Sequence, residues 1–461
     1  MSRTPAAPRA SLLLLAYLAF VSLGLPDGLI GVGWPSIRVD LGVPTEAVGV
    51  VLTAGTVAYL TSSVLAGFTL ARLGVGWLLA GSTLLAAVAL TGYALTPALA
   101  VLVGFALVLG IGSGAIDAGL NAYAAGAFGP RHMNWMHAFF GLGVALGPLI
   151  MTGVLGAGLS WRWGYAAVAT AQLALATAFA LTVRAWRDRG ANLPSRHAPP
   201  AAPDEATSPA GAAGRSGGAE CGMSALPAPR KPQHAASVTL AADPDDADPD
   251  DADPDHADPD HAEPRPRPTP IRETLRLPAV WLGGAAFAVY VAIEVTTGLW
   301  AYLLLTEGRG MAGPVAGLCV SGYWGSLFLG RVVQGLVAER LGSGGVLRGS
   351  LLGMVAGTAL IALPAPAWVT VAGLVVVGFA AAPVFPLLTL TTAERVGPAH
   401  ADRTIGLQMG AAGVGAALVP AGVGVLLART SVVLLGSTLV LLAVALLALH
   451  VVGARRAAPA A

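Results

Sequence analysis

Long apolar segments recur along the chain, and each is close to the roughly 20 residues that an α-helix needs to cross a bilayer. None alternates apolar and polar residues in the way of a membrane β-strand. The pattern therefore predicts an all-α polytopic membrane protein with twelve transmembrane helices, six before residue 190 and six after residue 275. The predicted spans cover residues 11–34, 47–70, 75–96, 98–126, 134–158, 163–187, 278–305, 313–338, 345–364, 366–394, 403–428 and 430–452.

Residues 190–272 interrupt this pattern. They are rich in Pro, Ala, Ser and Asp, and they contain the run DPDDADPDDADPDHADPDHA from Asp243 to Ala262. Such a composition buries too little apolar surface to offset the entropy of ordering the chain. We expect a disordered cytoplasmic linker between an N-terminal half, residues 1–189, and a C-terminal half, residues 273–461. His256 and His261 stand among the aspartates of the linker, and a solvated spacer is the preferred interpretation over a weak metal site.

The two halves repeat each other. The motif GFTLARLG from Gly67 recurs as GLVAERLG from Gly335, and each copy follows the second span of its half. Nearly the same offset carries Asp27 to Glu294, each in the first span of its half. We therefore expect two pseudo-symmetric six-helix bundles, with a substrate site between them near the middle of the membrane.

Arginines predict the orientation of the chain. They concentrate near both termini, in the central linker and in the connections on the same side of the membrane as the termini. Only Arg38, Arg162, Arg309 and Arg429 fall on the other side. The positive-inside rule then places both termini in the cytoplasm. The first apolar run continues through Trp34 without a convincing cleavage site, so we expect a retained span. Lys231 is the one lysine, whereas arginine and alanine abound, which suggests a GC-rich bacterial genome and therefore a bacterial inner (plasma) membrane.

Composition excludes several classes of function. The chain has 461 residues, 55% of them hydrophobic and 11% charged, and its net charge of +1 suggests no nucleic-acid partner. Its two cysteines, Cys221 and Cys319, predict neither a disulfide framework nor a metal site. The glycines from Gly110 to Gly114 lie inside a span and are expected to let helices pack closely, not to bind a nucleotide. We expect no enzyme, no cofactor and no metal, and a monomer whose partners are the lipid bilayer and a small molecule.

Ionisable residues inside the spans mark the candidate site. A charge at the bilayer centre costs about 2.5–3.5 kcal/mol on insertion scales, so such residues face the bundle interior and are functional by default. The acids are Asp27, Asp117 and Glu294. A rise of about 1.5 Å per residue puts Asp27 about 24 Å from the cytoplasmic end of its span and Asp117 roughly 30 Å from the outer end of its own.

Proton coupling is the expected role of these acids. Burial disfavours the charged form of a carboxyl group, which lets the group gain a proton on one side of the membrane and lose it on the other. We expect Asp27 to be the principal coupling acid, and Glu294 to share this role. Asp117, with Asn121 one helical turn later, would bind substrate hydroxyls or a second proton. The structural alternatives are a helix-kink role for Asp27 beside Pro26, and an ion pair of Asp117 with an arginine of another span.

Substrate and gating candidates complete the set. A carboxylate, an amide and aromatic faces together suit a sugar-like molecule. Arg331, near the inner end of its span, is expected to form a gating or anchoring ion pair. For Asn121 a helix-joining hydrogen bond, and for His137 an interfacial position, are the structural alternatives. The substrate-binding candidates are Asn121, His137, Trp300, Tyr323, Trp324 and Gln408.

The loop from Gly67 to Gly74 resembles the signature loop of the major facilitator superfamily. It departs from that signature at Ala71, where an acidic residue is usual, although Arg72 remains. The second copy keeps Glu339 and Arg340. The resemblance implies gating roles for Arg72, Glu339 and Arg340, and a weaker gate in the first copy.

A second resemblance concerns the first, fourth and fifth spans. PDGLIGVGWP from Pro26, DAGLN from Asp117 and HMNWMHAFFGLGVALGP from His132 are similar to the fucose/glucose/galactose permease group of that superfamily. His137 stands where sugar:proton symporters of that group have glutamine. The resemblance implies proton-coupled uptake of a sugar or similar metabolite by alternating access. A proton-driven efflux antiporter and a membrane sensor without transport are the alternatives.

Overall fold

The computed structural model describes residues 10–128, 130–186 and 270–457. The side chains of residues 125–126, 130–131, 134, 335–341 and 456–457 are outside this description. The repeats of the predicted linker, and its two histidines, therefore lie outside the described residues.

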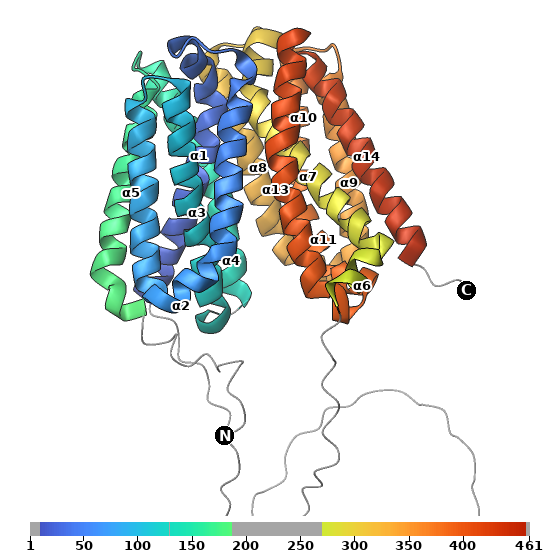
Figure 1. Ribbon diagram of the computed structural model, residues 1–461. Helices are drawn as coiled ribbons and strands as arrows, with labels where there is room; N and C mark the ends of the chain where they lie inside the picture. The colour runs from blue at the N-terminus through green and yellow to red at the C-terminus, as the bar shows by residue number, and fades with distance from the viewer. Residues whose placement is uncertain (1–9, 129, 187–269, 458–461) are drawn as a thin grey trace, which may run out of the picture. The chain divides into compact units, whose positions relative to one another are not determined.

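The N-terminal half consists of long helices (Figure 1). They are α1 (Ala10–Asp40), η1 (Thr45–Ala47), α2 (Val48–Leu95), α3 (Leu99–Ala127), α4 (Pro130–Gly156), α5 (Arg162–Thr182) and η2 (Val183–Trp186). The second and third predicted spans join into α2, which breaks at Gly74, where φ is 74° and ψ is 163°. A glycine adopts this conformation without steric cost because it has no Cβ. The signature-like loop is thus a sharp turn within α2.

The C-terminal half is divided more finely. Its elements are α6 (Ile271–Arg276), α7 (Pro278–Leu303), the π-helical turn η5 (Leu304–Gly308), α8 (Gly313–Leu341), α9 (Ser343–Ala362), α10 (Ala367–Ala381), α11 (Val384–Leu390), α12 (Thr392–Val396), α13 (Pro398–Arg429) and α14 (Leu434–Ala457). The predicted span 366–394 is divided among α10, α11 and the start of α12, and the break between α10 and α11 falls at Pro383, which lacks the backbone donor that a continuous helix needs. Helix α6 begins at Ile271, inside the range predicted for the linker.

The helices have the lengths that a bilayer requires. Among the described residues, ten helical segments are long and apolar enough to cross a membrane, and one of them, Thr45–Leu95, has 51 residues and contains two spans. Helix α8 is not among the ten, but its 29 residues are long enough to cross at a rise of about 1.5 Å per residue. No strand occurs in the described part of the chain. The predicted all-α polytopic class is confirmed.

The packing of the helices follows the predicted repeat. In the N-terminal half α1 packs on α4 and α2 on α3; in the C-terminal half the corresponding pairs are α7 with α13 and α9 with α10. The halves meet along α4 and α8, along α2 and α13, and along α1 and α7 (Figure 1). The fifth and eleventh spans are α4 and α13, and the second and eighth are the first part of α2 and α8. When the spans of each pair are exchanged, the α4–α8 contact becomes the α2–α13 contact. This relation is what a twofold axis along the membrane normal requires.

Three glycines of α3 bring it close to both parts of α2. A Cβ at Gly110 or Gly114 would collide with the carbonyl oxygens of Gly55 and Tyr59, and a Cβ at Gly112 would lie 2.7 Å from that of Ser82. The structure confirms that these glycines serve close helix packing. The same approach fixes the distance between Tyr59 and the face of α3 that carries Asp117.

The two ends of the bundle differ. We call the end where α1 begins and α14 ends the termini side, and the end where α1 finishes and α5 begins the loop side (Figure 1). On the loop side an arginine satisfies the last carbonyl groups of the third span of each half. Arg162 donates to Ala94 O at 3.2 Å and Thr96 O at 2.7 Å. Arg309 does the same for α9, at 3.0 and 2.7 Å from the carbonyls of residues 361 and 363.

Candidate functional site

The first cluster of the site joins α2 and α3 around Asp117. The Tyr59 hydroxyl donates to Asp117 Oδ2 over 2.7 Å, and Asn121 Nδ2 donates to Asp117 Oδ1 over 3.0 Å. The Asp117–Asn121 hydrogen bond is the one-turn pairing that the sequence suggests, since residues four apart share a helix face. Both carboxylate oxygens are therefore held by neutral donors.

Asp27 lies near the middle of α1 and has a different environment. Its side chain is exposed, whereas Pro26 and Gly28 on either side are buried. No hydrogen-bond or ion-pair partner of Asp27 occurs among the described residues. It interacts electrostatically with Tyr59, which also binds Asp117. Of the three predicted acids, Asp27 is thus the one whose carboxylate has no side-chain partner among the described residues.

The second cluster joins α7 and α8 around Glu294. Arg331 Nη2 lies 3.7 Å from Glu294 Oε1, and the Tyr290 hydroxyl donates to Glu294 Oε2. The ion-paired side chains are 20% and 14% exposed, so water screens them only partly. The hydroxyl of Tyr323 donates to the backbone carbonyl of Glu294 over 2.9 Å. Arg331 thereby has the ion pair expected of it, and its partner is the pseudo-symmetric equivalent of Asp27.

Helices α4 and α8 bring the two clusters towards each other. Arg331 Nη1 lies 3.7 Å from the position that a Cβ on Gly141 of α4 would take. One turn earlier on α4, the exposed His137 packs edge-on against Phe20 with ring centroids 5.2 Å apart. His137 interacts electrostatically with both Asp117 and Arg331. It therefore stands between the acid of one half and the base of the other.

The halves are closed against each other on the loop side. Arg38 of α1 forms an ion pair with Glu307 of η5 at 3.3 Å. A Cβ on Gly31 would lie 3.0 Å from Gly298 O, which shows how closely α1 approaches α7. In the same region Gly49 of α2 packs on Ala421 of α13.

The predicted aromatic platforms are buried beside this closure. Trp300 is 2% exposed, and its indole donates to Pro420 O over 3.1 Å. Tyr323 is fully buried, and its ring meets that of Trp324 at 4.9 Å between centroids. Trp324 is 8% exposed and packs on Gly298. In this conformation the three rings contact protein, and their role in substrate binding stays a prediction.

The remaining candidates lie away from the two clusters. Gln408 is 3% exposed and accepts a hydrogen bond from Thr392 Oγ1 over 3.0 Å, next to Gly283. Arg72 is exposed beside the break in α2. Glu339 and Arg340 belong to α8, but their side chains are outside the described set. Their predicted gating roles, and that of Arg331, stay predictions.

Two tyrosines of the site, Tyr59 and Tyr290, were not among the residues predicted from the sequence. Tyr290 is four residues before Glu294, a spacing that places both on one helix face, so this pair was accessible from the pattern. Tyr59 and Asp117 come from different spans, and no local spacing signals their contact. Among the described residues, no group of three or more His, Cys, Asp or Glu side chains could hold a metal ion.

Two repeated bundles of membrane-length helices with an ion pair and two further acids between them are the arrangement of a membrane transporter. The sequence profile of the Major Facilitator Superfamily matches residues 16–420. The chain belongs to this family, and its predicted superfamily membership is confirmed.

Solved structures agree with this assignment. Two crystal structures of the nucleoside transporter NupG, one of them of a mutant, superpose with TM-scores of 0.67 and 0.63 at 14% sequence identity. Each alignment covers 96% of this chain and 99% or more of the NupG chain. No curated protein sequence matches the chain. At this identity the likeness concerns the fold alone.

Proposed function

We propose that this transporter imports a small polar metabolite carrying hydroxyl groups, in the first place a sugar, together with protons. The single observation that carries the proposal is the state of Asp27. Asp27 is an exposed residue near the middle of α1, and its carboxylate has no hydrogen-bond or ion-pair partner among the described residues. An acid of this kind is available to take up a proton, whereas Asp117 and Glu294 are occupied by side-chain partners.

The substrate class follows from the donors and acceptors around Asp117. Tyr59, Asp117 and Asn121 together offer a hydroxyl, a carboxylate and an amide, which can exchange hydrogen bonds with the hydroxyl groups of a polyol. The exposed His137 of α4 adds a further hydrogen-bond donor or acceptor. Nucleosides also carry hydroxyl groups on their ribose, so they belong in the same substrate panel as hexoses and pentoses.

Alternating access would use the closed loop side as one of its two gates. In this scheme the Arg38–Glu307 ion pair and the close approach of α1 to α7 open when the halves rock. The arginine distribution supports an orientation with both termini in the cytoplasm of a bacterial cell. The imported substrate would then leave towards the termini side, and we expect the monomer to be sufficient.

Reconstituted vesicles test the coupling directly. The purified protein in proteoliposomes should accumulate one member of a panel of sugars and nucleosides when an inward proton gradient is imposed, and a protonophore should abolish this accumulation. Asp27→Asn should lose gradient-driven accumulation but keep exchange of labelled for unlabelled substrate. The matched control is Asp402→Asn, because Asp402 is an exposed acid of α13 away from the site.

Three outcomes contradict the proposal in different ways. Normal accumulation by Asp27→Asn shows that another group couples the proton. If the inward proton gradient drives substrate out of the proteoliposomes instead of into them, the protein is an efflux antiporter. Saturable binding without transport under any gradient identifies a sensor.

A further inference from the structure

A groove opens between α9 and α14 on the termini side, away from the transport site. It has a volume of about 440 Å³. Helix α9 contributes Arg348 and Leu352, and the end of α14 contributes the rest. The lining residues of α14 are Leu447, His450, Val451, Ala454 and Arg455.

The groove carries positive charge without a matching acid. Arg348 and Arg455 are both exposed. The Nε atom of Arg348 donates to Gly344 O of its own helix over 3.2 Å, which leaves its two terminal nitrogens available. Among the described residues, neither arginine has a carboxylate within ion-pair distance. The described residues that line the groove include no Asp or Glu.

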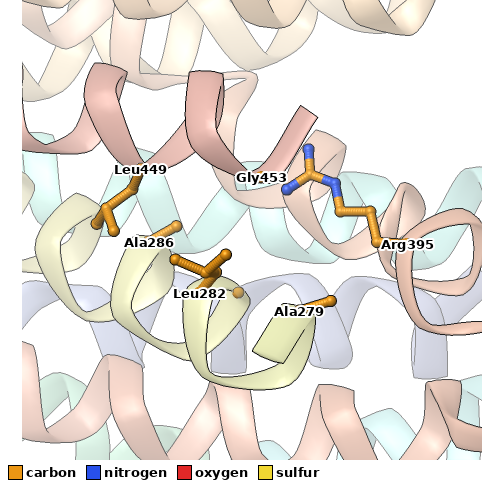
Figure 2. Close-up of a pocket in the computed structure, with 7 residues that line it drawn as sticks. Ala279, Leu282, Ala286, Arg395, Leu449 and Gly453 are labelled. Atoms are coloured by element: carbon orange, nitrogen blue, oxygen red, sulfur yellow. The ribbon is translucent and has the colours of Figure 1, made fainter. Parts of the chain in front are cut away.

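A third arginine approaches α14 from its other face. Arg395 of α12 lines a small pocket of about 40 Å³ with Leu449 and Gly453, and Figure 2 shows its guanidinium reaching towards the end of α14. Burial lowers the pKa of Arg395, and the adjacent Glu394 opposes that change. Electrostatic interactions connect His450 to both Arg348 and Arg395. The end of α14 is therefore flanked by basic side chains on two of its faces, Arg348 of α9 on one and Arg395 of α12 on the other.

Apolar side chains continue the groove towards the middle of the membrane. Leu352 lies one turn after Arg348 on α9 and is 58% exposed. On α14, Val451 is 39% and Val444 48% exposed, one and three turns before Arg455. At the opposite end the two helices close, because Gly436 packs directly on Ala362. The groove thus has a basic mouth at membrane-surface depth and apolar walls at acyl-chain depth.

We propose that this groove binds an anionic phospholipid, with the phosphate between Arg348 and Arg455 and an acyl chain along Leu352 and Val451. Guanidinium groups suit a phosphate because they donate in a fork that matches its oxygens. Basic pockets between transmembrane helices are suited to anionic head groups for the same reason. The lipid would support the end of α14 and the α9–α14 contact from the membrane.

Native mass spectrometry of the full-length protein tests this site. The protein is titrated in detergent with phosphatidylglycerol or phosphatidylcholine of identical acyl chains, and bound lipid is counted. The unaltered protein should retain phosphatidylglycerol in preference to phosphatidylcholine. Arg348→Gln with Arg455→Gln should weaken phosphatidylglycerol binding about 10–30-fold, because each arginine near a membrane surface contributes about 1 kcal/mol to anionic-lipid binding.

Two variants and one probe separate the alternatives. Arg429→Gln removes an exposed arginine from the loop-side end of α13 and should leave binding unchanged. Arg348→Lys with Arg455→Lys retains the charge and should keep most of the preference for phosphatidylglycerol. Unchanged lipid binding by the double glutamine variant, or an equal loss in Arg429→Gln, overturns the proposal. So does displacement of the lipid by millimolar inorganic phosphate, since the site would then bind a free anion.

Discussion

The hydroxyl of Tyr59 donates to the carboxylate of Asp117 over 2.7 Å and joins α2 to α3. Tyr290 binds Glu294 in the same manner in the C-terminal half. The second oxygen distinguishes the two carboxylates, because Asp117 receives the neutral amide of Asn121 while Glu294 receives the guanidinium of Arg331. The cluster of the C-terminal half is therefore compensated in charge, and the Asp117 cluster is not compensated by any of its hydrogen-bond partners.

Removal of the Tyr59 hydroxyl should weaken the Asp117 cluster. Tyr59→Phe leaves one carboxylate oxygen without its donor, and hydrogen bonds to charged groups contribute about 1.5–3 kcal/mol. We expect a lower unfolding temperature of the purified protein and a higher KM for uptake. Tyr165→Phe is the matched control, because the Tyr165 hydroxyl is buried without a hydrogen-bond partner among the described residues. An equal effect of both substitutions would show that the Tyr59–Asp117 bond has no special role.

The Glu294–Arg331 pair should behave as one unit. Glu294→Gln or Arg331→Gln leaves a largely buried charge without its partner, and each should lower the free energy of unfolding by about 3 kcal/mol. The double variant should lose less than the sum of the two, which a double-mutant cycle on thermal unfolding measures. The Arg38–Glu307 pair is 28% and 49% exposed, and its removal should change stability by only about 0–1 kcal/mol. Additive losses at Glu294 and Arg331 would contradict the pairing.

A larger residue at Gly317 should open the loop side. Gly317 of α8 faces Thr152 of α4 so closely that any Cβ would collide with the threonine side chain. Gly317→Val should therefore disfavour this closed state and shift the population towards the opposite conformation. Spin labels at Val39 and Ser431, in a background without Cys221 and Cys319, should show a longer distance distribution. Gly322→Val on the same helix meets open space and should leave the distribution unchanged.

Arg162 should contribute to stability far more than a typical exposed arginine. It donates to two carbonyl groups that end α2 and forms an ion pair with Asp40 at 2.8 Å, while its guanidinium stacks over Trp161 at 4.5 Å. Arg162→Gln should lower the free energy of unfolding by about 2 kcal/mol through these lost hydrogen bonds. Arg429→Gln should change it by less than about 0.5 kcal/mol, as expected for a surface substitution. Equal thermal shifts in the two variants would exclude the capping role.

The pattern of apolar residues predicted the helices because a bilayer constrains their length so strongly. Every predicted span corresponds to a helix, and the differences are local: Gly74 joins two spans within α2, and the region around Pro383 divides another. The repeat of GFTLARLG as GLVAERLG correctly indicated two related halves, as the exchange of the α4–α8 and α2–α13 contacts shows. The substrate role of the aromatic residues stays a prediction, since their type indicates a substrate platform and an interhelical core residue equally well.

The sequence by itself determined that the chain spans a membrane with two repeated bundles, and which ionisable residues lie inside them. The length of a segment, its hydropathy and the cost of a buried charge are local properties, so a single sequence is enough to predict the spans and the ionisable residues within them. Only the tertiary structure decided that Tyr59 holds Asp117, that Arg331 pairs with Glu294, and that Asp27 has no such partner in the described part of the chain. Those contacts depend on how each helix is rotated and shifted against its neighbours. That arrangement is set by the close packing of glycines such as Gly114 and Gly317 against other helices, and hydrophobic spacing along one span does not encode it.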